Sequence, residues 1–155
     1  MRILIVEDDF LSRRVLAEML DPYGACDCVA SGEEAIIAVC DGWKQGTPYN
    51  LICLDIKMPG INGDEVLQLI RGQEEERGIY GLDMVPIIMV TTVHDAKTIL
   101  SAFRNGLCDV YLIKPVEPAK LKQKMSELGF QPMGHEDGSL CRRRQPLTAK
   151  LGERR

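Results

Sequence analysis

Short apolar stretches alternate along the chain with longer segments whose apolar residues recur at intervals of three and four positions. The short stretches have the length of β-strands, and the longer segments have the spacing of helices that bury one face. The strand-like stretches are Ile3–Val6, Cys26–Ala30, Leu51–Leu54, Val85–Thr91 and Val110–Ile113. The helix-like segments are Leu11–Leu20, Glu33–Cys40, Asp64–Arg71, Ala96–Arg104 and Pro118–Leu128. This alternation predicts an α/β fold, a doubly wound five-stranded parallel sheet with five helices.

Capping residues and glycines mark the helix boundaries. Ser31, followed three positions later by Glu34, predicts the start of the second helix. Glycines that we expect to end helices are Gly72, Gly106 and Gly129. The acidic stretch Gln73–Gly81 either extends the third helix or forms a loop before the fourth strand.

Length and charge divide the chain into a domain and a tail. The chain has 155 residues, enough for one globular domain with a real core. Residues 1–129 carry 13 basic and 20 acidic side chains, whereas residues 130–155 carry 6 basic and 3 acidic ones. Because helical and strand periodicity is lost from residue 131, we predict a domain over 1–129 and a basic, disordered tail over 130–155.

The sequence shows neither a targeting signal nor a cysteine pattern that points to a function. The first residues lack the apolar run of a secretory signal, and no apolar stretch approaches the roughly 20 residues of a membrane helix. We therefore expect a soluble, cytoplasmic protein that does not enter a membrane. The six cysteines are then expected to be free thiols rather than disulfides or a zinc site.

Polar residues follow four of the predicted strands. Glu7, Asp8 and Asp9 follow the first, Asp55 the third, Thr91 ends the fourth, and Lys114 follows the fifth. Taken singly, each has an ordinary structural explanation, such as a turn, a helix cap for Asp9 or a solvated charge for Lys114. Ligands of open parallel sheets bind at the carboxyl ends of the strands, so the set as a whole predicts one site.

The side chains of this set are those needed to move a phosphoryl group. Clustered carboxylates repel one another unless a cation lies between them, and Mg²⁺ prefers oxygen ligands. A carboxylate beside Mg²⁺ can attack phosphorus as a nucleophile. Lys114 and Thr91 would supply positive charge and a hydroxyl donor to the phosphoryl oxygens.

Four stretches together resemble, in order and spacing, the receiver domain of two-component response regulators. They are "ILIVEDD", "LICLDIKMPGINGDEVL", "VPIIMVTT" and "VYLIKPVEPAKL". The resemblance covers about residues 1–129 and implies a flavodoxin-like sheet with strand order 2-1-3-4-5. It also implies a cis peptide bond between Lys114 and Pro115.

Site roles follow from the same resemblance. It implies that Asp55 is the phosphorylation site. It also implies that Mg²⁺ is held directly by Asp8, through water by Glu7, and by Asp55 and the main-chain carbonyl of Lys57. Thr91 and Lys114 would contact the phosphoryl group.

The resemblance also implies a conformational switch and its partners. Thr91 would move with Tyr111, which changes the face made by the fourth helix, the fifth strand and the fifth helix. The implied partners are a sensor histidine kinase or phosphotransfer protein and an unidentified output protein. The family resemblance also allows the protein to form a homodimer when it is phosphorylated. The protein would not be an enzyme beyond assisting its own phosphorylation and dephosphorylation.

Two other functions remain as alternatives. A Mg²⁺-dependent phosphatase of the haloacid dehalogenase type also uses an aspartyl nucleophile, but it needs a second Asp at the position of Lys57. A transcription factor would use the basic tail, which has too few residues for a helix-turn-helix domain and only three net positive charges for weak, salt-sensitive contact with phosphates. We therefore expect no specific binding to nucleic acid.

Overall fold

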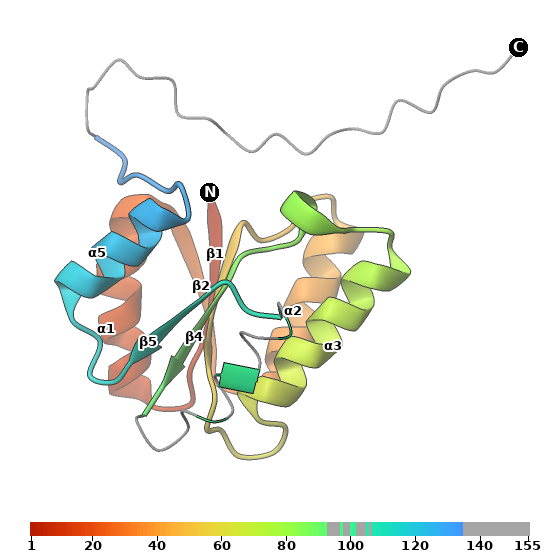
Figure 1. The fold of residues 1–155 in the computed structure, drawn as a ribbon, viewed down its shortest axis with the longest axis horizontal. Coiled ribbons are helices and arrows are strands. Elements are labelled where there is room, and N and C mark those ends of the chain that lie inside the picture. The colour runs from red at the N-terminus through yellow and green to blue at the C-terminus, as the bar shows by residue number, and fades with distance from the viewer. Residues whose placement is uncertain (93–96, 98–99, 102–104, 106, 135–155) are drawn as a thin grey trace, which may run out of the picture.

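A parallel five-stranded sheet forms the centre of the molecule in a computed structural model of the chain (Figure 1). The structure describes residues 1–92, 97, 100–101, 105 and 107–134. The strands are β1 (Arg2–Val6), β2 (Ala25–Val29), β3 (Leu51–Asp55), β4 (Ile87–Thr91) and β5 (Val110–Ile113). Their order is β2-β1-β3-β4-β5, and each neighbouring pair is parallel. The predicted fold class and strand order are confirmed.

Helices cover both faces of this sheet. Among the described residues the α-helices are α1 (Phe10–Leu20), α2 (Gly32–Lys44), α3 (Gly63–Glu76) and α5 (Pro118–Glu127). Two short 3-10 helices, η1 (Asp21–Tyr23) and η2 (Gly81–Asp83), follow α1 and α3. Figure 1 shows α1 and α5 on one side of the sheet and α2 and α3 on the other. The predicted helix over 96–104 falls largely outside the described residues.

Each central strand contributes to two cores. Alternate residues of β1 point to opposite faces, so Leu4 packs with α2 and α3 while Ile3 and Ile5 pack with α1 and α5. All five residues of β3 are buried for the same reason. Strands covered on both faces read as continuous apolar runs, which is why the sequence shows runs rather than alternation here.

The predicted caps are present at the first two helices. The Asp9 carboxylate accepts a hydrogen bond from the Ser12 N–H at 2.8 Å and starts α1. Ser31 Oγ accepts from the Glu34 N–H at 3.2 Å and starts α2. Gly129, with φ of +85°, follows the end of α5 as predicted. Gly106 lies outside the described residues.

The prediction that Gly72 ends the third helix is wrong. α3 continues to Glu76, and Gly72 lies inside it. The reason is tertiary: the buried guanidinium of Arg71 pairs with Glu74 at 2.7 Å, and the other carboxylate oxygen of Glu74 accepts from the Val85 N–H at 2.7 Å. These bonds hold the extra turn against the start of the next strand.

No helix among the described residues is both long and apolar enough to span a bilayer.

Candidate functional site

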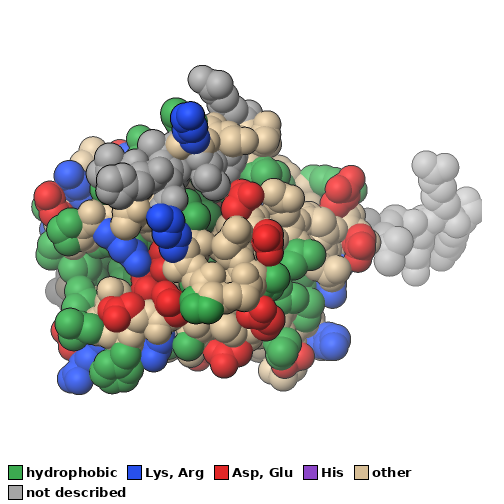
Figure 2. All heavy atoms as spheres, turned by 90° about the horizontal axis from the view of Figure 1, so that it is seen from below, with side chains coloured by type: hydrophobic (Ala, Val, Ile, Leu, Met, Phe, Trp, Pro, Cys, Tyr) green, Lys and Arg blue, Asp and Glu red, His purple; other side chains and the backbone are tan. Residues whose placement is uncertain are grey.

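The predicted site residues gather at the end of the molecule where the parallel strands finish. Glu7 and Asp8 directly follow β1, Asp55 ends β3, Thr91 ends β4, and Lys114 directly follows β5. Parallel strands in register end at one edge of the sheet, so topology alone brings these side chains together. Figure 2 looks onto this end and shows acidic and basic side chains beside one another on it.

Three carboxylates and one ammonium form the centre of the site. Glu7, Asp8 and Asp55 each offer a carboxylate oxygen, and these oxygens all lie within 4.8 Å of one another. Lys114 Nζ lies 2.8 Å from Glu7 Oε2 and 3.2 Å from Asp55 Oδ1. Glu7 and Asp55 are buried, whereas Asp8 is exposed. The cluster therefore opens to solvent on the side of Asp8.

Charge in this cluster is unbalanced. Burial, together with the negative charge of Glu7, raises the pKa of Asp55 to about 7 despite the opposing effect of Lys114. Burial lowers the pKa of Lys114, but its close contact with Glu7 and the charge of Asp55 outweigh burial and raise that pKa. One ammonium does not neutralise the carboxylates, so the site favours an additional cation.

The donor set fits a hard divalent cation. Carboxylate oxygens are the ligands that Mg²⁺ prefers, and Mg²⁺ binds through one or two carboxylates while it keeps several waters. The buried Glu7 Oε2 forms no well-directed hydrogen bond despite its ion pair with Lys114. The exposed side chain of Asp8 leaves a route for a hydrated ion. The acidic cluster could thus bind a metal.

Thr91 and Lys114 are connected through the backbone. The Lys114 N–H donates to the Thr91 carbonyl at 2.6 Å, which joins the ends of β4 and β5. The Thr91 side chain is buried, and its hydroxyl donates to the Thr92 carbonyl at 3.2 Å. The Lys114–Pro115 peptide bond is cis, as the family resemblance implies.

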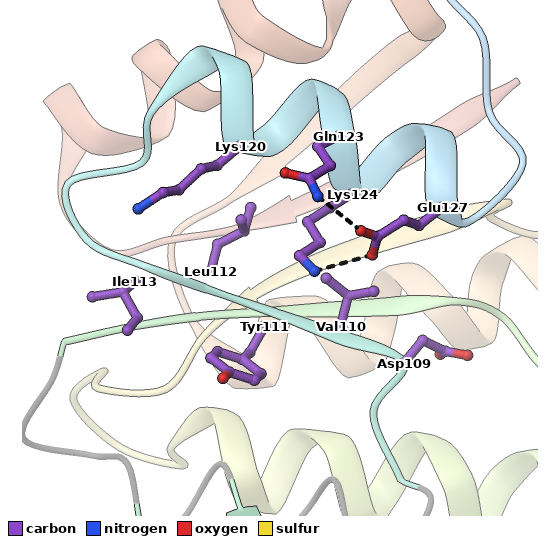
Figure 3. Close-up of a pocket in the computed structure, with 9 residues that line it drawn as sticks. All are labelled: Asp109, Val110, Tyr111, Leu112, Ile113, Lys120, Gln123, Lys124 and Glu127. Carbon is purple, nitrogen blue, oxygen red and sulfur yellow. Dashed lines mark hydrogen bonds and ion pairs between the residues drawn. The ribbon is translucent and has the colours of Figure 1, made fainter.

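Lys57 and Tyr111 are the two remaining residues that the family resemblance singles out. Lys57 follows Asp55 by two positions, and its side chain is exposed. Tyr111 belongs to the edge strand β5 and is 40% exposed. Figure 3 shows Tyr111 beside a groove that runs between β5 and α5, where Lys124 and Glu127 form an ion pair at 3.0 Å.

Gly63, which the sequence analysis did not single out, lies against the end of β3, where Asp55 stands. Its N–H donates to the Ile56 carbonyl at 2.8 Å, so the start of α3 presses on the end of β3. A Cβ at Gly63 would overlap the carbonyl oxygen of Asp55 and lie 2.8 Å from Ile56 Cα. The sequence offers one signal for this position, a glycine directly after the capping Asn62. That signal does not reveal how closely Gly63 approaches the backbone of Asp55.

Comparison with known proteins places these features in a family. The family described as the response regulator receiver domain matches residues 3–126. The chain is 30% identical over 139 residues to hybrid signal transduction histidine kinase L of Dictyostelium discoideum, a match that covers 89% of this chain and 8% of that protein. Several other curated relatives are also longer, and the chain spans 29% to 50% of their length.

Solved structures agree with the sequence matches. Response regulator protein TrrA from Thermotoga maritima, in complex with Mg²⁺ and BeF, superposes with a TM-score of 0.65 at 33% identity and covers 82% of this chain and 97% of that one. The receiver domain of Ssk1 from Saccharomyces cerevisiae was co-crystallised with the histidine phosphotransfer protein Ypd1. The matching chain of that complex gives a TM-score of 0.69 at 28% identity, covering 83% of this chain and 88% of that one.

Proposed function

This chain belongs to the response regulator receiver domain family, and we propose that Asp55 is its phosphorylation site. Receiver domains act in two-component phosphorelays as signalling switches rather than as enzymes with turnover. The observation that carries the proposal is the position of the Asp55 carboxylate. It ends β3, lies within 4.8 Å of two further carboxylates and stands 3.2 Å from the Lys114 ammonium.

We assign the metal-binding role to Glu7, Asp8 and Asp55 with the main-chain carbonyl of Lys57. When bound there, Mg²⁺ would neutralise charge on the carboxylates and on the incoming phosphoryl oxygens. The complex of TrrA with Mg²⁺ and BeF supports this choice of ion. In this chain Glu7 holds its position by accepting from the Asp9 N–H at 3.1 Å and by pairing with Lys114 at 2.8 Å.

Lys114 and Thr91 would respond to the new charge. Phosphorylation adds roughly one negative charge and several strong acceptor oxygens at Asp55. Lys114 is already in contact with Asp55, and Thr91 is tied to Lys114 through the backbone. The hydroxyl of Thr91 would exchange its bond to Thr92 for one to the phosphoryl group.

Movement of Thr91 would then be transmitted to Tyr111 and to the face that β5 and α5 share with the helix predicted over 96–104. A shift of a two-state equilibrium from 1:99 to 99:1 needs about 5.5 kcal/mol of differential interaction. A few charge-assisted hydrogen bonds, at about 1.5–3 kcal/mol each, supply that amount. The groove of Figure 3 belongs to this face, so an output protein that binds there would sense the change.

The phosphodonor in this proposal is a histidine kinase or a histidine phosphotransfer protein. The Ypd1–Ssk1 complex supports a donor of this class, because its receiver domain shares the fold of this chain. We further propose that the functional unit comprises residues 1–129, with 130–155 as an appended tail, and that it acts in the cytoplasm. Dimerisation on phosphorylation is a further prediction from the family resemblance.

Chemical phosphorylation tests the proposal. We expect a small phosphodonor with Mg²⁺ to add one phosphoryl group, detectable by intact-mass spectrometry, and chelation of Mg²⁺ to prevent it. Asp55→Asn should abolish the addition. Asp64→Asn is the matched control, because Asp64 is a partly exposed acid in the first turn of α3. Labelling of the Asp55→Asn variant at the wild-type rate would refute the assignment.

A further inference from the structure

A surface at the opposite end of the molecule combines exposed apolar side chains with acidic ones. After α3 the chain forms η2, where Tyr80 is 61% exposed and Leu82 is 78% exposed. Tyr80 is held in place because its hydroxyl donates to the Glu75 carbonyl at 3.2 Å. We call the surface made by Glu75, Glu76, Tyr80, Leu82 and Asp83 the η2 patch.

The η2 patch presents negative charge to solvent. Residues 73–84 contain four acidic side chains and one basic side chain. Glu74 is buried against Arg71, so it does not contribute to the surface. The single base, Arg77, lies over the Trp43 ring at 4.4 Å and donates to Gln73 Oε1 at 2.6 Å. Glu75, Glu76 and Asp83 are exposed, and so is Arg77, so the exposed side chains of this stretch carry three negative charges and one positive charge.

We propose that residues 140–155 of this same chain dock on the η2 patch. This segment carries six basic side chains and one acidic side chain, together with three leucines. Its leucines are Leu140, Leu147 and Leu151. Its composition thus complements the patch in both respects, because basic groups face acidic ones and leucines face an exposed Tyr and Leu. Surfaces that pair opposite charge around apolar contacts are favoured in specific association.

The point where the tail leaves the domain supports docking within one molecule. Met133 N–H donates to the Pro22 carbonyl at 2.7 Å, which fixes the start of the tail beside η1. Figure 1 shows that this point and η2 lie at the same end of the molecule, where the strands begin. Leu151 lies seventeen positions after Gly134. That length of chain can span roughly 55 Å, whereas a domain of this size is roughly 35 Å across.

Tethering makes a weak contact sufficient. A segment attached by a short linker has an effective concentration of the order of mM at its own docking surface. Charged contacts of this kind are screened over about 8 Å at physiological ionic strength and about 3 Å at 1 M. Docking should therefore be largely complete in low salt and lost in high salt.

The acidic cluster of the phosphorylation site is a poorer surface for this segment. It lies at the other end of the strands, and its buried members Glu7 and Asp55 already share the Lys114 ammonium. Asp9 is engaged in capping α1. Docking at the η2 patch leaves the mouth of that site open, so the proposal does not depend on the proposed phosphorylation.

Paramagnetic labelling of the full chain tests the docking. A nitroxide placed on Cys141, in a variant whose Cys26, Cys28 and Cys40 are replaced by serine, should broaden the amide signals of residues 79–83 in low salt. These signals should recover in 1 M salt. The double variant Tyr80→Ser/Leu82→Ser should lose the broadening, while Ile37→Ser, which removes an equally exposed apolar side chain on α2, should keep it.

Three results would overturn the proposal. The first is broadening at Glu7–Asp9 in place of residues 79–83, which would move the tail to the phosphorylation site. The second is the absence of localised broadening, or broadening that the Tyr80→Ser/Leu82→Ser variant retains. The third is broadening that persists when the nitroxide and the isotope enrichment are on different chains, which would mean contact between molecules.

Discussion

Gly63 provides the sharpest test of how the fold positions Asp55. An alanine at this position would place its Cβ on the carbonyl oxygen of Asp55 and 2.8 Å from Ile56 Cα, both backbone atoms. Backbone atoms cannot move aside by changing rotamer, so the start of α3 would have to shift away from the end of β3 by roughly half an ångström or more. Overpacking of this kind costs about 1–3 kcal/mol, and we expect Gly63→Ala to lie at the upper end.

Gly72→Ala in the same helix is the matched control. Gly72 is exposed, and beyond its chain neighbours and the adjacent backbone of α3 no atom lies within 4 Å of a Cβ built there. Replacing a mid-helix glycine by alanine stabilises a helix by about 0.5–1 kcal/mol. The two Gly→Ala variants should thus change stability in opposite directions.

Urea unfolding measures both changes. With a slope of about 2 kcal/mol per M, Gly63→Ala should lower the midpoint by about 1–1.5 M and Gly72→Ala should raise it by a few tenths of a molar unit. Because the shift moves the Asp55 carbonyl, Gly63→Ala should also weaken Mg²⁺ binding. A Gly63→Ala variant as stable as the wild type would refute the close approach on which the account of this site rests.

Three further predictions concern charged side chains at the site and at the end of α3. With Mg²⁺ removed by a chelator, Asp55→Asn should stabilise the protein at pH 8 but not near pH 4. The folded pKa of Asp55 is raised to about 7, so the stability of the wild type falls as pH rises from the unfolded pKa of Asp55 through 7. Equal urea midpoints for both proteins at pH 8 would contradict that sign. Mg²⁺ at about 100 times its Kd should raise the free energy of unfolding by about 2.7 kcal/mol. Thermal melts should show this gain in the control variant Asp64→Asn but not in Asp8→Asn. A full gain in Asp8→Asn would exclude Asp8 as a ligand. Arg71→Met should lower the free energy of unfolding by about 3–5 kcal/mol because it leaves buried Glu74 without its cation; a loss below about 1 kcal/mol in urea unfolding would show that Arg71 does not hold the end of α3.

The sheet could be predicted from the sequence because its strands are buried on both faces. Short apolar runs such as Leu51–Leu54 are typical of strands buried between two layers of helices. Their alternation with helical segments favours parallel connections between the strands. The convergence of Glu7, Asp55 and Lys114 then followed from topology, because parallel strands end at one edge. Their roles in phosphorylation are still predictions.

The features that escaped prediction depend on contacts between distant residues. The extra turn of α3 exists because Arg71 and Glu74 bind Leu107, Val85 and Asp109, which local spacing around Gly72 does not reveal. The close approach of Gly63 to Asp55 is likewise a tertiary contact. The spacing of apolar residues therefore predicts the position of α3 but not the residue at which it ends.

The central claim is that Asp55 accepts the phosphoryl group, and residue-level mapping of the acyl phosphate tests it most directly. After reaction with Mg²⁺ and a small phosphodonor, borohydride reduces an acyl phosphate to an alcohol and so marks the residue that carried it. The account predicts the mark at Asp55 alone. A mark at Glu7 or Asp8, or no mark on a protein whose mass shows a phosphoryl group, would contradict it.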